Sequence, residues 1–99
     1  MIDKIKQDPN VEKLFEGILE LKTVDECYRF FDDLCTGPEL RSISQRFVVA
    51  KMLLDHKIYN DIVTDTGAST ATISRVNRSL TDGNDGYMIV FDRLKKEKQ

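Results

Sequence analysis

The chain has 99 residues, of which 40% are hydrophobic, and its formal net charge is −2. This size suits one small domain that buries a modest fraction of its surface, so a core shared with a second copy would help to stabilise it. An acidic chain argues against loose, charge-driven coating of nucleic acid. Residues 1–36 carry 5 basic and 9 acidic side chains, whereas residues 37–99 carry 10 basic and 8 acidic ones. Any basic surface must therefore be local.

The residue inventory disfavours several kinds of site. Cys27 and Cys35 are eight residues apart in one predicted helix, a separation of about 12 Å that is too long for a disulfide, so we expect two reduced, partly buried thiols. A single histidine, His56, without a CxxC or HExxH pattern predicts no metal site, and no cofactor is expected. The sequence shows neither the apolar core of a signal peptide nor the roughly 20 apolar residues of a membrane span. We expect a cytoplasmic protein.

Residues 1–36 are predicted to form two amphipathic helices that contribute to dimerisation. Asp8 and Pro9 supply a capping acceptor followed by a proline at the first helical position. Thr23 and Glu26 have the spacing of a capping box, in which each side chain accepts a backbone N–H near the helix start. Apolar residues then recur at helical spacing: Val11, Leu14, Phe15, Ile18 and Leu19 in the first helix, and Val24, Cys27, Tyr28, Phe31 and Leu34 in the second.

Residues 37–56 are predicted to form a long central helix. Thr36 and Glu39 repeat the capping-box spacing, and a proline follows the turn between them. The segments 47–50 and 52–54 place apolar groups nearly all round the helix axis, which indicates burial on more than one side. A chain of this size has difficulty covering such a helix alone, so we infer that a second copy covers part of it. A homodimer is the economical interpretation.

Residues 59–80 fit a helix-turn-helix, in which two short helices cross steeply around a tight turn. Gly67 stands where the chain must leave the first helix in a left-handed conformation that glycine adopts without steric cost. Ser69 follows as the predicted cap of the second helix. The side chains expected on the buried side are Ile62 and Val63 from the first helix, Ala68, Ile73 and Val76 from the second, and Leu80 a turn later.

Residues 84–99 are predicted to contain a short last helix and a charged tail, after a loose segment over residues 81–86. No strand-like alternation of useful length is present, because the β-branched residues of 62–76 fall at helical spacing. The fold class is therefore all-α, as a single domain over residues 1–99 with about six helices. Apolar residues at helical spacing mark the last helix: Tyr87, Val90, Phe91 and Leu94.

The outward face of the second helix in the helix-turn-helix is predicted to enter the major groove of double-stranded DNA. Small side chains allow close approach, hydroxyl and methyl groups can contact base edges, and arginines can reach guanine or phosphate. Residues 68–80 contain two arginines and no acid, while Asp61 and Asp65 on the first helix oppose contact with phosphate. The predicted DNA-binding residues are Ser69, Thr70, Ala71, Thr72, Ser74, Arg75 and Arg78.

The stretch from Leu34 to Leu80 resembles the Trp repressor family, which is a known helix-turn-helix family. The resemblance implies an all-helical, intertwined dimer of roughly six helices per chain, in which the long central helix is shared between subunits. It also implies control of amino-acid biosynthesis genes, with a small-molecule corepressor as a further partner. The residues that carry the resemblance are Gly67, Ala68, the run Ala71-Thr72-Ile73-Ser74-Arg75, Ser79 and Leu80, together with Arg46, Leu53 and Leu54 before them.

The same resemblance implies where an effector would bind. In family members that bind tryptophan, two arginines sandwich the amino acid, and these positions match Arg46 and Arg75 here. A glycine follows the second arginine in that pattern, whereas this chain has Val76, whose branched side chain is expected to fill space that an indole needs. Tryptophan is therefore disfavoured, and the chain is more similar to the Trp-repressor-like subgroup of unassigned ligand. The two arginines are then a vestigial pair, a site for another small anion, or a structural and DNA-facing pair.

Three classes of function compete. The first is a dimeric, sequence-specific transcriptional regulator, a repressor that binds a double-stranded DNA operator. The second is a helical dimer that acts as a protein-interaction module, in which Tyr28, Phe30 and Phe31 contact a partner and the helix-turn-helix only supports packing. An enzyme is the weakest class, because the acidic pairs at 25–26 and 32–33 lie beside no residue set with catalytic geometry. The residues favour the DNA-binding regulator.

Overall fold

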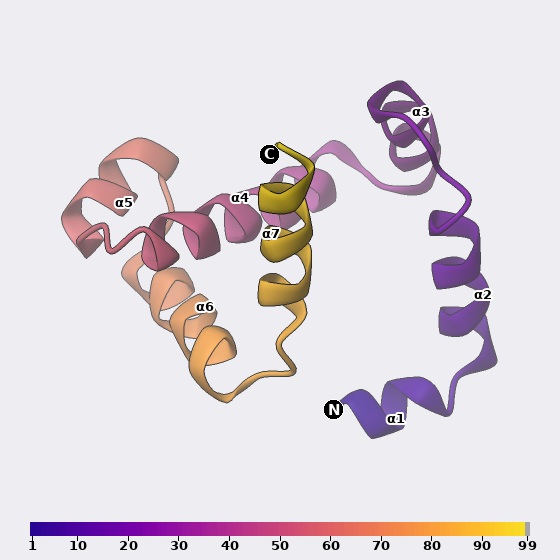
Figure 1. Cartoon of the computed structure of the whole chain (residues 1–99), viewed down its shortest axis with the longest axis horizontal. Coiled ribbons are helices and arrows are strands. Elements are labelled where there is room, and N and C mark those ends of the chain that lie inside the picture. The colour runs from indigo at the N-terminus through magenta and orange to yellow at the C-terminus, as the bar shows by residue number, and fades with distance from the viewer. Residues whose placement is uncertain (99) are drawn as a thin grey trace. The chain divides into compact units, whose positions relative to one another are not determined.

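The computed structural model describes residues 1–98, and within them it contains helices and no strands (Figure 1). The all-α prediction is confirmed. There are seven helices in this range instead of about six, because a short additional helix, α1, precedes the two expected near the N-terminus. The chain divides into two compact units, unit 1 over residues 1–37 and unit 2 from Pro38 onwards. The expectation of a single domain stays a prediction.

Unit 1 contains α1 (Ile2–Lys6), α2 (Pro9–Ile18) and α3 (Val24–Leu34). Both predicted caps are present: the Asp8 carboxylate accepts the N–H of Asn10 at 2.9 Å, and Thr23 Oγ1 accepts the N–H of Glu26 at 3.1 Å. The Glu26 carboxylate accepts the N–H of Lys22 at 2.8 Å, one residue before the position that a capping box requires. Local side-chain chemistry therefore defines where both longer helices of this unit begin.

Unit 1 has no fully buried side chain in any of its three helices. Leu19 is 82% exposed and Tyr28 is 70% exposed, although both are apolar or aromatic. Cys27 and Cys35 are both free, as expected, but the prediction that both are partly buried is wrong for Cys27, which is exposed. The apolar stripe of α3 is thus open to solvent in the single chain, because α1 and α2 offer too little surface to cover it. Three apolar residues of α2 are half-buried: Val11, Leu14 and Ile18.

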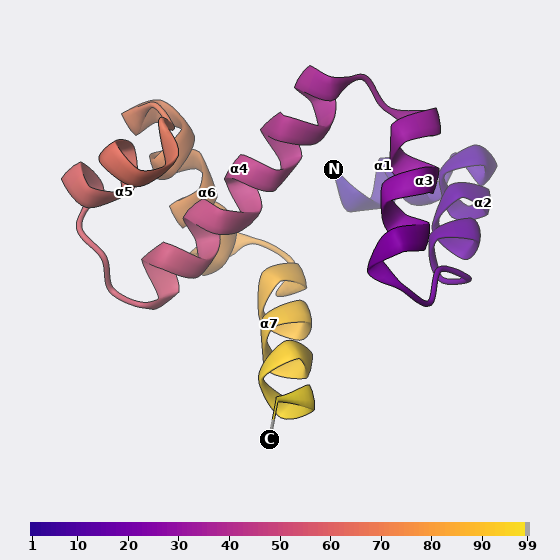
Figure 2. The same cartoon turned by 90° about the horizontal axis from the view of Figure 1, so that it is seen from above.

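Unit 2 contains α4 (Gly37–Leu54), α5 (Tyr59–Thr66), α6 (Thr70–Asp82) and α7 (Gly86–Glu97). Figure 2 shows α5 and α6 at one end of α4, and α7, which follows α6 along the chain, running at a steep angle to α4. The long helix ends at Leu54, slightly earlier than predicted, because His56 adopts a left-handed conformation with φ 63°. Its N–H bonds to the carbonyl of Leu53, and the next N–H bonds back to Met52, both at 3.0 Å, which closes the helix.

The core of the chain lies entirely in unit 2. Helix α7 packs against one edge of this core, where the ring centroids of Phe91 and Phe47 are 4.8 Å apart. The long helix α4 is buried along one side, whereas Ile43 and Val48 are about half exposed. These outward apolar groups are the surface for which a second copy was expected, and that partner stays a prediction. The buried side chains are Val49 and Ala50 of α4, Ile62 of α5, Ala68 in the turn, and Ile73 and Val76 of α6.

Candidate nucleic-acid interface

The segment formed by α5, the turn at Gly67 and α6, which we call the reading head, has the predicted helix-turn-helix connectivity. Gly67 ends α5 with φ 72° and ψ 5°, and its N–H donates to the carbonyl of Val63 at 2.8 Å. No atom lies within 4 Å of the position that a Cβ on Gly67 would take. The left-handed backbone, and not lack of space, is therefore what requires glycine at this turn.

Two hydrogen bonds of Thr66 hold the turn, and sequence reasoning missed them. The Thr66 hydroxyl donates to the carbonyl of Ile62 at 2.6 Å and accepts the N–H of Ala68 at 3.1 Å. The backbone carbonyl of Thr66 accepts a further bond, at 3.1 Å, from the side-chain amide of Gln45 on α4. A threonine just before a turn glycine is a local signal that could have been noticed. The partner Gln45 lies 21 residues away and leaves no such signal.

The start of α6 is capped as predicted. Ser69 has an extended backbone, and its Oγ accepts the N–H of Thr72 at 3.1 Å. The same hydroxyl donates to Thr72 Oγ1 at 3.0 Å, and Thr72 is half-buried. The Thr72 hydroxyl therefore belongs to the capping arrangement. Among the predicted DNA-binding residues, Thr72 is the half-buried one, and its hydroxyl accepts a hydrogen bond from the cap residue Ser69.

The other predicted DNA-binding residues are exposed, and apart from Ser69, the cap that precedes α6, they share one face of α6. Arg75 and Arg78 form no ion pair with any residue of the described chain, so both guanidinium groups remain available to a ligand. The opposite face of α6 is buried, with Ile73 at 0% and Val76 at 1% exposure, so packing fixes which side chains point outward. The outward set consists of Ser69, Thr70, Ala71, Ser74, Arg75 and Arg78.

The predicted effector residues are not gathered into one described cavity. Arg46 is half-buried, its Nη1 donates to Ser42 Oγ at 3.0 Å, and the cavity that it lines takes all its walls from α4. Arg75 is exposed on α6. Val76 packs in the core, where its side chain fills interior space that a glycine would leave open. None of the described cavities is therefore lined by more than one of the three residues.

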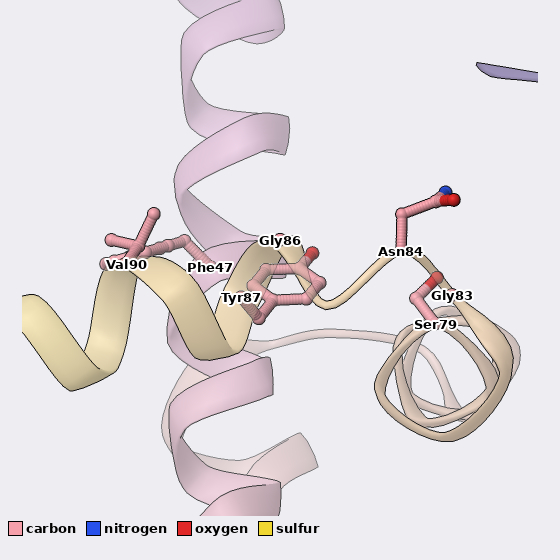
Figure 3. Close-up of a pocket in the computed structure, with 7 residues that line it drawn as sticks. All are labelled: Phe47, Ser79, Gly83, Asn84, Gly86, Tyr87 and Val90. Atoms are coloured by element: carbon pink, nitrogen blue, oxygen red, sulfur yellow. The ribbon is translucent and has the colours of Figure 1, made fainter. Parts of the chain in front are cut away.

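A different cavity, of about 410 Å³, lies where the end of α6 approaches α4 and α7. Its lining carries hydroxyl and amide groups and no charged side chain. The turn beside it is tight, because a Cβ at Gly83 would collide with the backbone carbonyl of Ser79. In Figure 3, side chains of α4 and α7 lie on one side of this cavity, and the end of α6 with the turn after it lies on the other. The first side consists of Phe47, Tyr87 and Val90 with Gly86 at the start of α7, and the second of Ser79, Gly83 and Asn84.

Other classes of site find no support among residues 1–98. No group of three or more histidine, cysteine, aspartate or glutamate side chains in this range could hold a metal ion. No helix in the described chain is long and apolar enough to cross a membrane. The exposed face of α6 from Thr70 to Arg78, which carries two arginines and no acid, is the surface with the clearest functional chemistry.

The family model of the Trp repressor protein matches residues 9–95, which span both units and the whole reading head. The chain belongs to the Trp repressor family. This is a family of regulators and not of enzymes, which agrees with the helix-turn-helix described above. The family prediction made from the reading head is therefore confirmed.

Individual members of the Trp repressor family are similar over nearly the whole chain. YerC of Bacillus subtilis (strain 168) is 54% identical over 95 residues, covering 96% of this chain and 90% of YerC. A TrpR-like protein from Eubacterium eligens has a solved structure with 61% identity and a TM-score of 0.89, covering 94% of this chain and 95% of its own. A candidate Trp repressor from Staphylococcus aureus has 49% identity and a TM-score of 0.87, covering 92% and 93%.

Proposed function

We propose that the protein is a homodimeric transcriptional repressor that binds a double-stranded DNA operator sequence-specifically through α6. The observation that carries this proposal is the two-sided construction of α6. Its inner face packs into the core through Ile73 and Val76. From Thr70 to Arg78 its outer face presents small, hydroxyl and arginine side chains without an acid, and the acid of this helix, Asp82, comes one turn later. A rigid helix with such a face suits the major groove.

The outward residues divide into two expected roles. Thr70, Ala71 and Ser74 are small enough to let the helix approach base edges, where methyl groups contact thymine and hydroxyls accept or donate hydrogen bonds. Arg75 and Arg78 reach guanine or phosphate, and phosphate contacts fix the orientation of the helix on the duplex. Ser69 and the half-buried Thr72 complete the predicted set by holding the N-terminus of α6 in place.

The homodimer is supported by the apolar groups that the single chain leaves exposed. Leu19 and Tyr28 of unit 1, and Val48 of unit 2, would each be covered at an interface between two copies. A two-fold symmetric dimer reads a palindromic operator, because each reading head meets an equivalent half-site. Two half-sites also raise the number of bases read beyond what one short helix can contact.

For the effector, we infer a small molecule other than tryptophan, or none. Val76 supports this inference, because its buried side chain occupies the position that is glycine in the tryptophan-binding pattern. Arg46 and Arg75 then bind another small anion together, or are a vestigial pair, or have separate roles in which Arg46 is structural and Arg75 contacts DNA. Control of amino-acid biosynthesis genes and a cytoplasmic location belong to the same proposal.

Selection of bound sequences from a pool of random duplexes tests the function directly. We expect a palindromic site whose half-sites are separated by about one helical turn, roughly 34 Å, or a multiple of it. Affinity for this site should fall steeply with salt, because phosphate contacts release counterions. No preference for any duplex over competitor DNA at low salt, with or without added amino acids, would sink the proposal.

The change Arg75→Ala tests whether the outward face of α6 contacts DNA. Loss of one arginine contact to base or phosphate should weaken binding to the selected site by roughly 5- to 150-fold. Arg29→Ala is the matched control, since Arg29 is an exposed arginine of α3 that pairs with Asp25 at 2.9 Å. Equal affinity of the Arg75→Ala variant and the unaltered protein, in a fluorescence anisotropy titration, would remove Arg75 from the interface.

The alternative function is a protein-interaction module without specific DNA binding. The observation in its favour is the exposed aromatic surface of α3, where Tyr28 is 70% exposed and the rings of Phe30 and Phe31 meet edge to face at 5.4 Å. The two functions differ in what covers this surface. A pull-down with the purified dimer distinguishes them, because a protein partner recovered stoichiometrically in the absence of DNA supports the module, whereas selective binding of one duplex without such a partner supports the repressor.

A further inference from the structure

We propose that Gln45 is a positioning residue that fixes the orientation of the reading head on α4 and so sets the half-site spacing that the dimer accepts. This inference rests on the proposed function. It starts from the hydrogen bond in which Gln45 Nε2 donates to the backbone carbonyl of Thr66 at 3.1 Å. Nearby hydroxyls instead bond within their own helices, as Ser44 does to the Arg41 carbonyl and Thr64 to the Asn60 carbonyl, both at 2.9 Å.

The bond supplements apolar contacts that hold the reading head on α4. Gln45 lies one turn before Val49, on the same side of α4, and Val49 is in the core with Ile62 and Ile73. Apolar packing is non-directional and tolerates small rotations, whereas a hydrogen bond restricts both distance and angle. The Gln45 amide therefore adds a directional attachment beside the core, at the end of α5 where the turn begins.

Thr66 transmits this attachment to the start of α6. Its carbonyl accepts from Gln45, while its hydroxyl accepts the N–H of Ala68. Ala68 is 2% exposed and immediately precedes Ser69, the cap of α6. Gln45 of α4 is thus connected, through Thr66, to the backbone that sets the direction of α6. In a dimer whose subunits meet along α4, a change in the direction of α6 alters the separation of the two reading heads.

Loss of the bond should change orientation more than stability. Gln45 and Thr66 line an open cavity of about 370 Å³ together with Arg41, Val48 and Asp65. Water in this cavity can satisfy the Thr66 carbonyl when the amide is absent, so the core is not left with an unpaired buried acceptor. Water imposes no particular angle between α4 and α5, because it can move with the carbonyl. The expected defect is therefore a change in the angle between α4 and the reading head.

The test uses Gln45→Leu on the operator found by selection and on duplexes whose half-site separation is lengthened or shortened by single base pairs. We expect the preference for the best spacing over its neighbours to fall by roughly 2- to 10-fold, the range that corresponds to one hydrogen bond. Ser44→Ala is the matched control, since this hydroxyl lines the same cavity and bonds only within α4. Unchanged spacing preference in Gln45→Leu, with DNA binding intact, would overturn the inference.

Gln45→Glu separates the hydrogen bond from the shape of the side chain. A carboxylate has no hydrogen to donate to the Thr66 carbonyl, whereas a protonated carboxyl has one. The spacing preference of Gln45→Glu should therefore be low at neutral pH and recover as the pH falls towards about 4.3, relative to the unaltered protein at each pH. Glutamate has nearly the shape of glutamine, so a Gln45→Glu variant without a defect at either end of this range would mean that Gln45 acts through shape alone. A defect that does not recover at low pH would overturn the role of the hydrogen bond.

A measurement without DNA keeps the inference testable if no operator is found. Residual dipolar couplings of the backbone amides report the angle between α4 and α6 in the dimer. In Gln45→Leu we expect the couplings of α6 to change relative to those of α4, and in Ser44→Ala to stay the same. Couplings that are identical in Gln45→Leu and the unaltered protein would overturn the positioning role, whereas failure of the selection alone would overturn only the proposed function.

Discussion

The reading head and the helices of unit 1 have similar sequence signals and different degrees of burial. Both have capped helices and amphipathic patterns, yet α6 buries Ile73 and Val76 almost completely while α3 buries no side chain. The reading head is covered by α4 of the same chain. The apolar side chains of unit 1 have no such cover within their unit. The difference indicates that α6 is positioned by packing within one chain, whereas the apolar face of unit 1 is the surface that the proposed dimer would cover.

The largest expected effect comes from removing a core side chain of the reading head. Ile73→Ala should destabilise the protein by about 2–5 kcal/mol, because the surrounding core cannot fully close the space left behind. Chemical denaturation measures this loss of unfolding free energy. The loss should be the same at all protein concentrations high enough to keep the proposed dimer associated. Binding of DNA should weaken in parallel, since Ile73 fixes the inner face of α6.

Leu19→Ala is the counterpart of that change in unit 1. Leu19 is 82% exposed in the single chain, so its removal should cost little in the folded chain itself and should instead weaken association of two copies. Denaturation midpoints measured over a range of concentrations will separate the two effects. If Leu19→Ala proves as costly as Ile73→Ala and independent of concentration, unit 1 is packed within its own chain and the contrast between the regions fails.

The next effect concerns two glycines, one in each region. Gly67→Ala should destabilise the protein by about 1–2 kcal/mol, because a Cβ is disfavoured at φ 72° even where no atom would touch it. Gly17→Ala, in the last turn of α2, also meets no atom within 4 Å and should stabilise that helix by up to about 0.5–1 kcal/mol, the value for a helix interior. Thermal denaturation of the two variants should therefore shift in opposite directions, and a shift of the same sign would contradict the role of the left-handed turn.

The comparison also shows which features a sequence can reveal. The left-handed Gly67, the cap Ser69 and the buried Ile73 depend on residues within a few positions of each other, so spacing alone predicted them. The bond from Gln45 to Thr66 depends on two helices meeting in space, and no local pattern encodes that meeting.

Two other differences have local physical causes. Helix α1 was not predicted, because its five residues, Ile2–Lys6, are too few to show a repeating apolar face. Cys27 was expected to be partly buried because it falls on the apolar stripe of α3, and it is exposed because unit 1 has nothing to cover that stripe. Periodicity identifies which face of a helix is apolar but does not identify the chain that covers it.

A smaller effect is expected from the two hydroxyl caps. Ser69 and Thr23 each accept the N–H of the residue three positions later at 3.1 Å, so their bonds are closely matched. Each change to alanine removes a cap worth about 1 kcal/mol to its helix. Ser69→Ala should reduce global stability and DNA affinity together, whereas Thr23→Ala should reduce global stability only to the extent that α3 unfolds with the core. Hydrogen exchange of the amides at positions 26 and 72 will show which helix start opens.

The smallest effect concerns two exposed ion pairs, one at the end of α4, the helix that covers the reading head, and one in α3 of unit 1. Lys51 Nζ lies 2.9 Å from the Asp55 carboxylate in α4, and this hydrogen bond holds the pKa of Asp55 below its ordinary value. The carboxylate therefore stabilises the folded state above the unfolded pKa of about 3.9, and this contribution is lost as the pH falls through the lower, folded pKa. Solvent screens the pair, so its effect on stability is small.

Lys51→Met should raise the pKa of Asp55 towards its ordinary value, as an NMR titration of the carboxyl carbon will show. The stability difference between this variant and the unaltered protein should be present at neutral pH and disappear in acid, since a protonated Asp55 gains nothing from Lys51. Arg29→Met, which removes the ion pair of the same spacing in α3, should leave the Asp55 titration unchanged. Because α4 carries part of the core and α3 carries none, any loss of global stability should come from Lys51→Met and not from Arg29→Met, and it should be small because both partners are exposed.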